Sequence, residues 1–201
     1  VWILFLLSVI TCLKVKAQYM PVVFDKVYGD KNQIQLVCPL SGDEVALVGK
    51  EGQKYNLTWV EREGDVVFSL PLTGFTAVNE IVELDNSQVL VVGQSSVPNV
   101  KGKKDKITLC GRIVVINRGG RIVTDIYAGD QGSNFLKGML LRSGAFVVSG
   151  SEPKGADGRQ GILLKLDPTG SVVYQYKNAG GGYCDQFAVM GNSIEYICAA
   201  F

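Results

Sequence analysis

Three stretches of the chain are variants of one phrase: "GDVVFSLPLTG" (64–74), "GRIVTDIYAGD" (120–130) and "GSVVYQYKNAG" (170–180). Each leads into an apolar run that closes on a small residue, Gly93, Gly150 or Ala199, which lies 29, 30 or 29 residues after the opening glycine. A fainter copy, "MPVVF" from Met20, leads to "VALVG" ending at Gly49 with the same spacing. The repeat units therefore start at residues 20, 64, 120 and 170.

A second pattern precedes three of these starts. The segments "YNLTWVEREG", "GRIVVINRGG" and "GILLKLDPTG" each place apolar, mostly β-branched residues before a four-residue polar turn. The "DPTG" of Asp167–Gly170 has the chemistry of a type I turn, so the flanking segments are predicted to be hairpin strands. No stretch longer than about ten residues keeps a helical period without a glycine. The sequence predicts an all-β chain.

Each unit is expected to contain four antiparallel strands. Recurrence every 44 to 56 residues is typical of β-propeller blades, which bury their faces by stacking on one another. We expect complete four-stranded sets at 34–70, 77–127 and 135–177, a lone outer strand at 21–28, and two inner strands at 186–190 and 194–199. These sets do not close a ring, so an incomplete ring in a C-terminally truncated fragment is predicted. A β-sandwich is the alternative fold.

The repeat also resembles a known one. The run "GILLKLDPTGSVVYQY", a glycine-rich break and "GNSIEYICAA" are similar to the "GflvKlDsnGnvvw…dGgyivaG" repeat of exported, surface-associated propeller proteins of Gram-negative bacteria. The resemblance spans residues 19–201 and is clearest from Gly111 onward. It implies a secreted propeller with WD-repeat or quinoprotein-like blades and implies no particular activity.

The N-terminus predicts export. Residues 2–13, "WILFLLSVITCL", form an uncharged segment too short to span a membrane and typical of a secretory signal. We predict a signal peptide at 1–17, cleaved after Ala17, and a repeat domain at 18–201 with no transmembrane anchor. The alternatives are lipid attachment at Cys12 and an uncleaved anchor. The expected location is the periplasm, the cell surface or the medium.

Composition limits the function. Signal cleavage would remove two of the 20 basic residues and none of the 19 acidic ones, leaving a net charge near −1. This charge gives no electrostatic attraction for nucleic acid, so we expect no nucleic-acid partner. The chain has no histidine, which excludes Ser-His-Asp and Cys-His catalysis and argues against a metal site. We therefore expect no catalytic residue, no metal and no cofactor.

Three groups of residues are candidate sites, each with a plainer alternative. The lysines of the inserted loop 95–110 could contact an acidic partner or belong to a solvated connector; they are Lys101, Lys103, Lys104 and Lys106. Asp30, Asp130 and Asp185 recur at similar places in three copies, as cation ligands near the axis or as turn residues. Cys184 and Cys198 form a disulfide or a reduced buried pair.

The leading functional hypothesis is a non-catalytic exported module that binds or scaffolds a protein or glycan ligand. The alternative is part of a propeller enzyme, either a quinoprotein-like dehydrogenase or a glycan hydrolase or lyase. The dehydrogenase would need tryptophan-docking repeats, yet the only tryptophans are Trp2, in the signal, and Trp59. A purely structural stalk is a third possibility.

Overall fold

The computed structural model describes residues 33–84, 88–97, 108–141, 143–155 and 158–178, together with the backbone of two short strands at 188–190 and 193–195. The strands are β1 (Gln33–Leu40), β2 (Glu44–Glu51), β3 (Lys54–Val60), β4 (Val66–Pro71), β5 (Phe75–Leu84), β6 (Gln88–Val97), β7 (Thr108–Asn117), β8 (Ile122–Ala128), β9 (Asn134–Leu140), β10 (Phe146–Lys154), β11 (Gly158–Leu166), β12 (Val172–Lys177), β13 (Ala188–Met190) and β14 (Ser193–Glu195). The described residues contain no helix, so the prediction of an all-β chain is confirmed.

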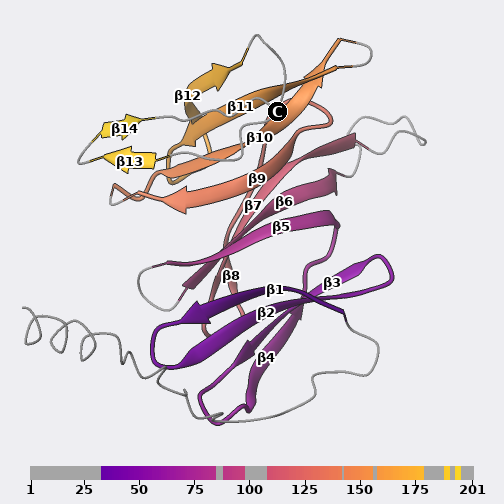
Figure 1. The fold of residues 1–201 in the computed structure, drawn as a ribbon, viewed down its shortest axis with the longest axis vertical. Coiled ribbons are helices and arrows are strands. Elements are labelled where there is room, and N and C mark those ends of the chain that lie inside the picture. The colour runs from indigo at the N-terminus through magenta and orange to yellow at the C-terminus, as the bar shows by residue number, and fades with distance from the viewer. Residues whose placement is uncertain are drawn as a thin grey trace, which may run out of the picture.

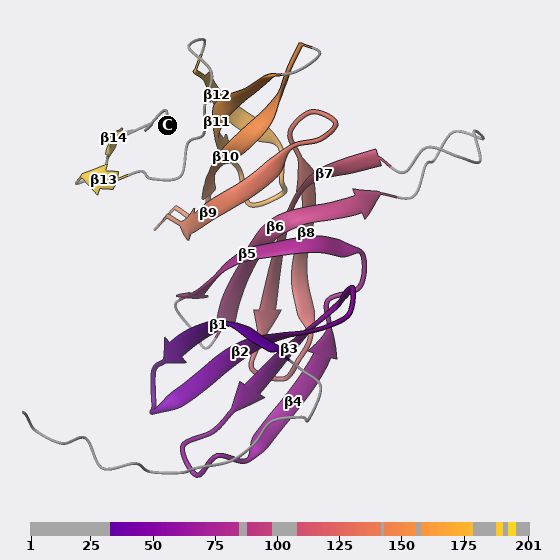
Figure 2. The same ribbon diagram turned by 45° about the vertical axis from the view of Figure 1, so that its right-hand side comes forward.

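The strands form three four-stranded antiparallel sheets, each a simple up-and-down meander. Sheet 1 is β1–β4, sheet 2 is β5–β8 and sheet 3 is β9–β12, and β13 pairs with β14. The sheets are stacked in chain order along the long axis of the molecule (Figures 1 and 2). The predicted four-stranded sets at 34–70, 77–127 and 135–177 are confirmed. Among the described strands none joins sheet 3 to sheet 1, as expected of an incomplete ring.

One turn recurs at the last hairpin of every sheet. A polar residue begins it and a left-handed glycine ends it, with φ of 82° at Gly64, 74° at Gly120 and 93° at Gly170. The glycine N–H donates to the carbonyl of the first turn residue; the pairs are Gly64–Glu61 (2.8 Å), Gly120–Asn117 (2.9 Å) and Gly170–Asp167 (3.0 Å). These features define a type I turn closed by a glycine bulge, which explains the repeated glycines. A separate register shift follows on each outer strand, where Val67, Val123 or Val173 is the extra residue.

A second irregularity recurs on the innermost strands β1, β5 and β9. Each has an extra residue, Gln35, Asn79 or Leu136, where the strand register shifts, and β5 has a second one at Thr76. The bulge lies opposite the glycine that closes each apolar run: Gly49, Gly93 or Gly150. A Cβ at Gly93 would overlap the Ala77 carbonyl oxygen, and one at Gly150 would overlap that of Asn134. The second repeated glycine is therefore required by a close backbone approach.

Two apolar cores hold the stack together. The core between sheets 1 and 2 includes Trp59, Leu57, Val91 and Val114, and Trp59 lies 5.8 Å from Phe68 between ring centroids. The core between sheets 2 and 3 includes Phe135, Ile113, Val148 and Leu164. Because each sheet is buried by its neighbours, the repetition of the unit stabilises every copy.

Polar contacts fix the order of the sheets. At the inner strands, the amide of the bulged residue Asn79 donates to Asn134 Oδ1 (2.6 Å) and to the Phe135 carbonyl oxygen (2.5 Å). Beside it, Glu80 accepts from Lys137 Nζ (2.9 Å) and from the Gly138 N–H (2.7 Å). At the turn end, Arg118 of sheet 2 forms an ion pair with Glu44 of sheet 1. The bulge thus aims a side chain at the next sheet.

The described part of the chain includes no helix of the length and hydrophobicity that a membrane span requires.

Candidate functional site

Among the three candidate acids, only Asp130 lies in the described part of the chain. It lies in the connector 129–133 between β8 and β9, and its carbonyl oxygen accepts hydrogen bonds from the Ser133 N–H (2.9 Å) and Oγ (2.5 Å). Its carboxylate is exposed and pairs with Lys177 Nζ at 2.9 Å. Asp130 therefore shapes a turn and reaches sheet 3, and its proposed role as a cation ligand remains a prediction.

The other candidates lie outside the described residues. They are Asp30, Asp185, Lys101, Lys103, Lys104, Lys106, Cys184 and Cys198, together with Cys12. The predicted loop 95–110 is shorter than expected, because 95–97 and 108–110 extend β6 and β7. The Ser95 hydroxyl (2.7 Å) and the Ser96 N–H (2.9 Å) both donate to the Gly74 carbonyl oxygen, which fixes this extension. Described Cys38 and Cys110 are free, buried thiols.

A polar cluster surrounds the β8–β9 connector. The Gly132 carbonyl oxygen accepts from Arg159 Nη2 (3.0 Å), while Gln94 Nε2 donates to the Ser133 carbonyl oxygen (3.0 Å). Arg159 also donates through Nε to Ser151 Oγ (2.8 Å). Sheets 2 and 3 therefore both bind the connector that joins them.

The same cluster contains a buried carboxylate. Glu152 is 1% exposed, and its Oε1 accepts from Lys177 Nζ (2.5 Å) and Gln160 Nε2 (2.8 Å). The hydrogen bonds to Glu152 and then to Asp130 raise the pKa of Lys177, so this lysine stays charged. A charged lysine held between two carboxylates offsets part of their negative charge, and this arrangement suits positioning better than proton transfer.

The β4–β5 connector, residues 72–74, is bound in an equivalent way. Arg112 of β7 is 7% exposed and donates through Nη1 to the Thr73 carbonyl oxygen (2.6 Å). Its guanidinium makes two hydrogen bonds of 2.8 Å to the Asp125 carboxylate and stacks on Phe75 and Tyr127. Since an arginine from the following sheet binds each connector, these two buried polar clusters have a structural role.

No group of three potential metal-ligating side chains of the histidine, cysteine, aspartate or glutamate type comes together within the described ranges.

The surface that differs most from the repeat is on sheet 3. On sheets 1 and 2, the side chains four and six residues after the turn glycine lie on the face of the outer strand that packs on the next sheet. These positions hold Phe68 and Leu70 on sheet 1, and Thr124 and Ile126 on sheet 2, which are wholly or partly buried. On sheet 3 they hold Tyr174 and Tyr176, which are 44% and 42% exposed.

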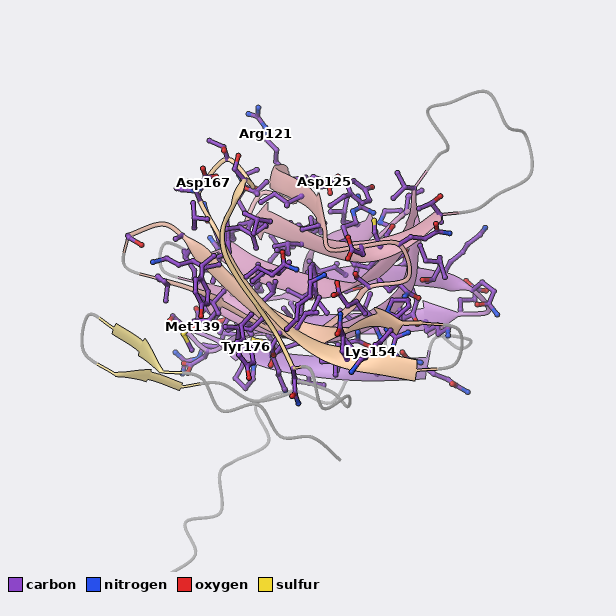
Figure 3. The ribbon with its side chains drawn as sticks, turned by 90° about the horizontal axis from the view of Figure 1, so that it is seen from above. Arg121, Asp125, Met139, Lys154, Asp167 and Tyr176 are labelled. Atoms are coloured by element: carbon purple, nitrogen blue, oxygen red, sulfur yellow. The ribbon has the colours of Figure 1, made fainter. Side chains whose placement is uncertain are left out.

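The two tyrosines share their face with Lys165. Strand pairing places Tyr174 opposite Lys165 and Tyr176 opposite Leu163. The intervening β11 residues, Ile162 and Leu164, point the other way, into the core with sheet 2. We name Lys165, Tyr174 and Tyr176 the tyrosine ledge; Figure 3, viewed from the sheet 3 end of the stack, labels Tyr176 on it.

The tyrosine ledge was not predicted from the sequence. The signal was present, since "VVYQY" puts tyrosine where the first copy has Phe68 and Leu70. Whether these tyrosines are exposed depends on which face of the outer strand is covered, and that follows from the packing of sheet 3 on sheet 2.

No protein-family model matches the chain, and no curated protein matches it either. The fold defines a class: an all-β repeat protein of packed four-stranded antiparallel sheets, consistent with propeller-like blades.

Proposed function

We propose that the protein is an exported, non-catalytic propeller-type module that binds a protein or glycan ligand, with the tyrosine ledge as its contact surface. One observation carries the proposal: positions that are wholly or partly buried on sheets 1 and 2 hold two exposed tyrosines on sheet 3.

Tyrosine is well suited to such a surface. It combines a large apolar ring with a polar tip and loses little conformational entropy on binding, so it is enriched at binding interfaces. Two residues apart on a strand, Tyr174 and Tyr176 are roughly 6.5–7 Å apart on one face. The Lys165 ammonium beside them adds a hydrogen-bond donor for a carboxylate or hydroxyl group.

The rigid stack supports the same function. One buried core and the arginine-bound β8–β9 connector fix sheet 3 to sheet 2, so the ledge lies on regular strands. Contact residues on rigid elements need little ordering when they bind. The resemblance to exported bacterial propeller repeats supports a location at the cell surface, in the periplasm or in the medium.

The test is binding of the purified full chain to a glycan microarray and to a peptide array, followed by titration of the best ligand. A Tyr174→Ala/Tyr176→Ala double variant is expected to lose at least tenfold in affinity. Val66→Ala is the control, because Val66 is 50% exposed on sheet 1, away from the ledge, and the affinity should stay within twofold.

Three outcomes would contradict the proposal. They are equal binding by the double variant and the parent, no ligand on either array, and chemical conversion of the bound glycan. The last would favour the alternative, a propeller hydrolase or lyase.

A further inference from the structure

The charged residues on the outer face of sheet 3, the face that points away from sheet 2, are all basic. Strand pairing assigns alternate residues of β9–β12 to this face, while Val148 and Leu164 point the other way, into the core with sheet 2. Among the described strand residues of this face none is acidic, and the charged ones are Lys137, Arg159 and Lys165. The face therefore attracts anionic groups.

Only one of the three cations has no partner in the stack. Lys137 forms an ion pair with Glu80 of sheet 2 at 2.9 Å, and Arg159 donates to the Gly132 carbonyl oxygen at 3.0 Å. Lys165 is half-buried, and within the described part of the chain no carboxylate forms an ion pair with it. A cation that has lost part of its hydration without gaining a counter-charge favours the binding of an anion.

The position of Lys165 is apolar in the other two sheets. Trp59 and Val115 occupy it there, and they are 1% and 2% exposed in the cores that join each sheet to the next. The three equivalent cross-strand pairs are Trp59–Phe68, Val115–Thr124 and Lys165–Tyr174. On sheet 3 a cation beside two exposed tyrosines thus replaces a core residue, which suits a polar ligand better than another sheet.

The tyrosine ledge differs from the usual peptide-binding surfaces. Strand addition needs a regular free edge, but the extra residue Val173 interrupts the register of β12 and leaves four regularly paired residues, Tyr174–Lys177. Acidic and phosphorylated motifs are bound by clusters of arginines, whereas the ledge has a single lysine. A sugar ring, by contrast, can stack its C–H face on an aromatic ring and exchange hydrogen bonds with a tyrosine hydroxyl.

We propose that the ligand of the tyrosine ledge is an acidic glycan built of uronic acid sugars. Its sugar rings stack on Tyr174 and Tyr176, and one carboxylate pairs with the Lys165 ammonium. A single ammonium is a point charge that balances one carboxylate, whereas a densely sulfated chain calls for several cations. This inference rests on the proposed function, because it takes the ledge to be the contact surface.

The charge of the ligand can be tested with the unaltered protein. The probes are oligosaccharides of galacturonate, mannuronate and glucuronate, together with their methyl esters, which keep the sugar and remove the charge. In calorimetric titrations of the full chain, at least one acid is expected to bind, and its ester should bind at least about tenfold more weakly. Equal binding of acid and ester, or binding of none of the three acids, would overturn the proposal.

Variants of Lys165 test whether this residue recognises the carboxylate. Lys165→Met keeps the length of the side chain, and the affinity for the acid should fall at least about tenfold, whereas Lys165→Arg should keep it within about threefold. Lys54→Met is the matched control, because Lys54 is exposed on sheet 1, and its affinity should stay within about twofold. Unchanged binding by Lys165→Met would overturn the proposal.

The double variant Tyr174→Ala/Tyr176→Ala separates this inference from the proposed function. If the ligand found is a peptide or a neutral glycan whose binding requires the two tyrosines, the ledge remains the contact surface and only the acidic glycan is overturned. If a uronate binds the double variant as tightly as the parent, the ledge is not the contact surface and both proposals are overturned.

Discussion

The carbonyl oxygen of Ala77 occupies the space in which a side chain at Gly93 would begin. This contact connects the repeated glycine, 29 residues after the opening one, to the bulge at Asn79 on the innermost strand. The bulge in turn directs the Asn79 amide to β9 of the next sheet.

Gly93→Ala is therefore expected to destabilise the protein, because the backbone of β5 must move to admit the methyl group. Overpacking of this kind costs about 1–3 kcal/mol. Gly119→Ala is the control, since its Cβ would meet only Asn117 Oδ1 at 3.4 Å and its φ is not positive, and its effect should stay within about 0.5 kcal/mol. Urea unfolding of the two variants gives the comparison, and equal effects would show that the bulge does not constrain Gly93.

Asn79→Ala removes the amide that links the innermost strands of sheets 2 and 3. The expected loss is about 1–2 kcal/mol, because the variant also leaves the Phe135 carbonyl without this donor. Thr58→Ala is the matched control: it breaks an exposed hydrogen bond to Ser69 within sheet 1 and should cost less than about 0.5 kcal/mol. Thermal unfolding distinguishes the two, and an Asn79→Ala variant as stable as the control would contradict the link.

Lys177→Met leaves the buried Glu152 carboxylate without its cation. Breaking a fully buried pair costs about 3–5 kcal/mol, and partial exposure of the lysine reduces the expected loss here to about 2–3 kcal/mol. The double variant Lys177→Met/Glu152→Met should recover most of it, since no charge then remains buried. Asp130→Asn should change the stability by less than about 1 kcal/mol because Asp130 is exposed. Chemical denaturation measures the free energy of unfolding of both variants. A double variant no more stable than Lys177→Met would contradict the claim that Lys177 compensates for the buried charge of Glu152.

The pair formed by Arg118 and Glu44 predicts a pH dependence. Burial alone would raise the pKa of Glu44, but hydrogen bonds from Arg118 and Trp59 outweigh it, and the pKa is lower than the ordinary glutamate value of 4.5. A carboxyl group with a lowered pKa in the folded state stabilises the protein above its ordinary pKa, and this contribution is lost as the pH falls through the lowered one.

Arg118→Ala should therefore lower the melting temperature at pH 7, and the difference from the parent should shrink below pH 4.5. The control is Arg62→Ala, because Arg62 meets Asp43 at 3.6 Å with both side chains well exposed. Its melting temperature should stay close to that of the parent at every pH. A difference for Arg118→Ala that is independent of pH would mean that Glu44 does not contribute through its charge.

The sequence was sufficient to predict the fold because the positions that decide it are local. Each turn glycine needs a left-handed φ, so it recurs with the turn, and the apolar runs between the turns are long enough to be buried strands. The four-stranded sets predicted from these signals agree with the structure to within a few residues.

Polar contacts between distant segments were not predictable in this way. Asp130 was singled out, but its partner Lys177 lies 47 residues further along the chain. Arg112 and Arg159 occupy different positions in their repeat units, yet each binds a connector, so counting along the repeat does not find them. The tyrosine ledge depends on which face of sheet 3 is covered, a property of the whole stack.

The stacking of one repeat on the next is tested most directly by a single nuclear Overhauser effect. A Cβ at Gly170 would lie 2.8 Å from Ile126 Cγ1, which places the turn of sheet 3 on the outer strand of sheet 2. In a methyl-labelled sample, we predict a strong signal between a Gly170 α-hydrogen and the Ile126 δ-methyl group. Assigned spectra of the folded protein without that signal would contradict the stacked arrangement.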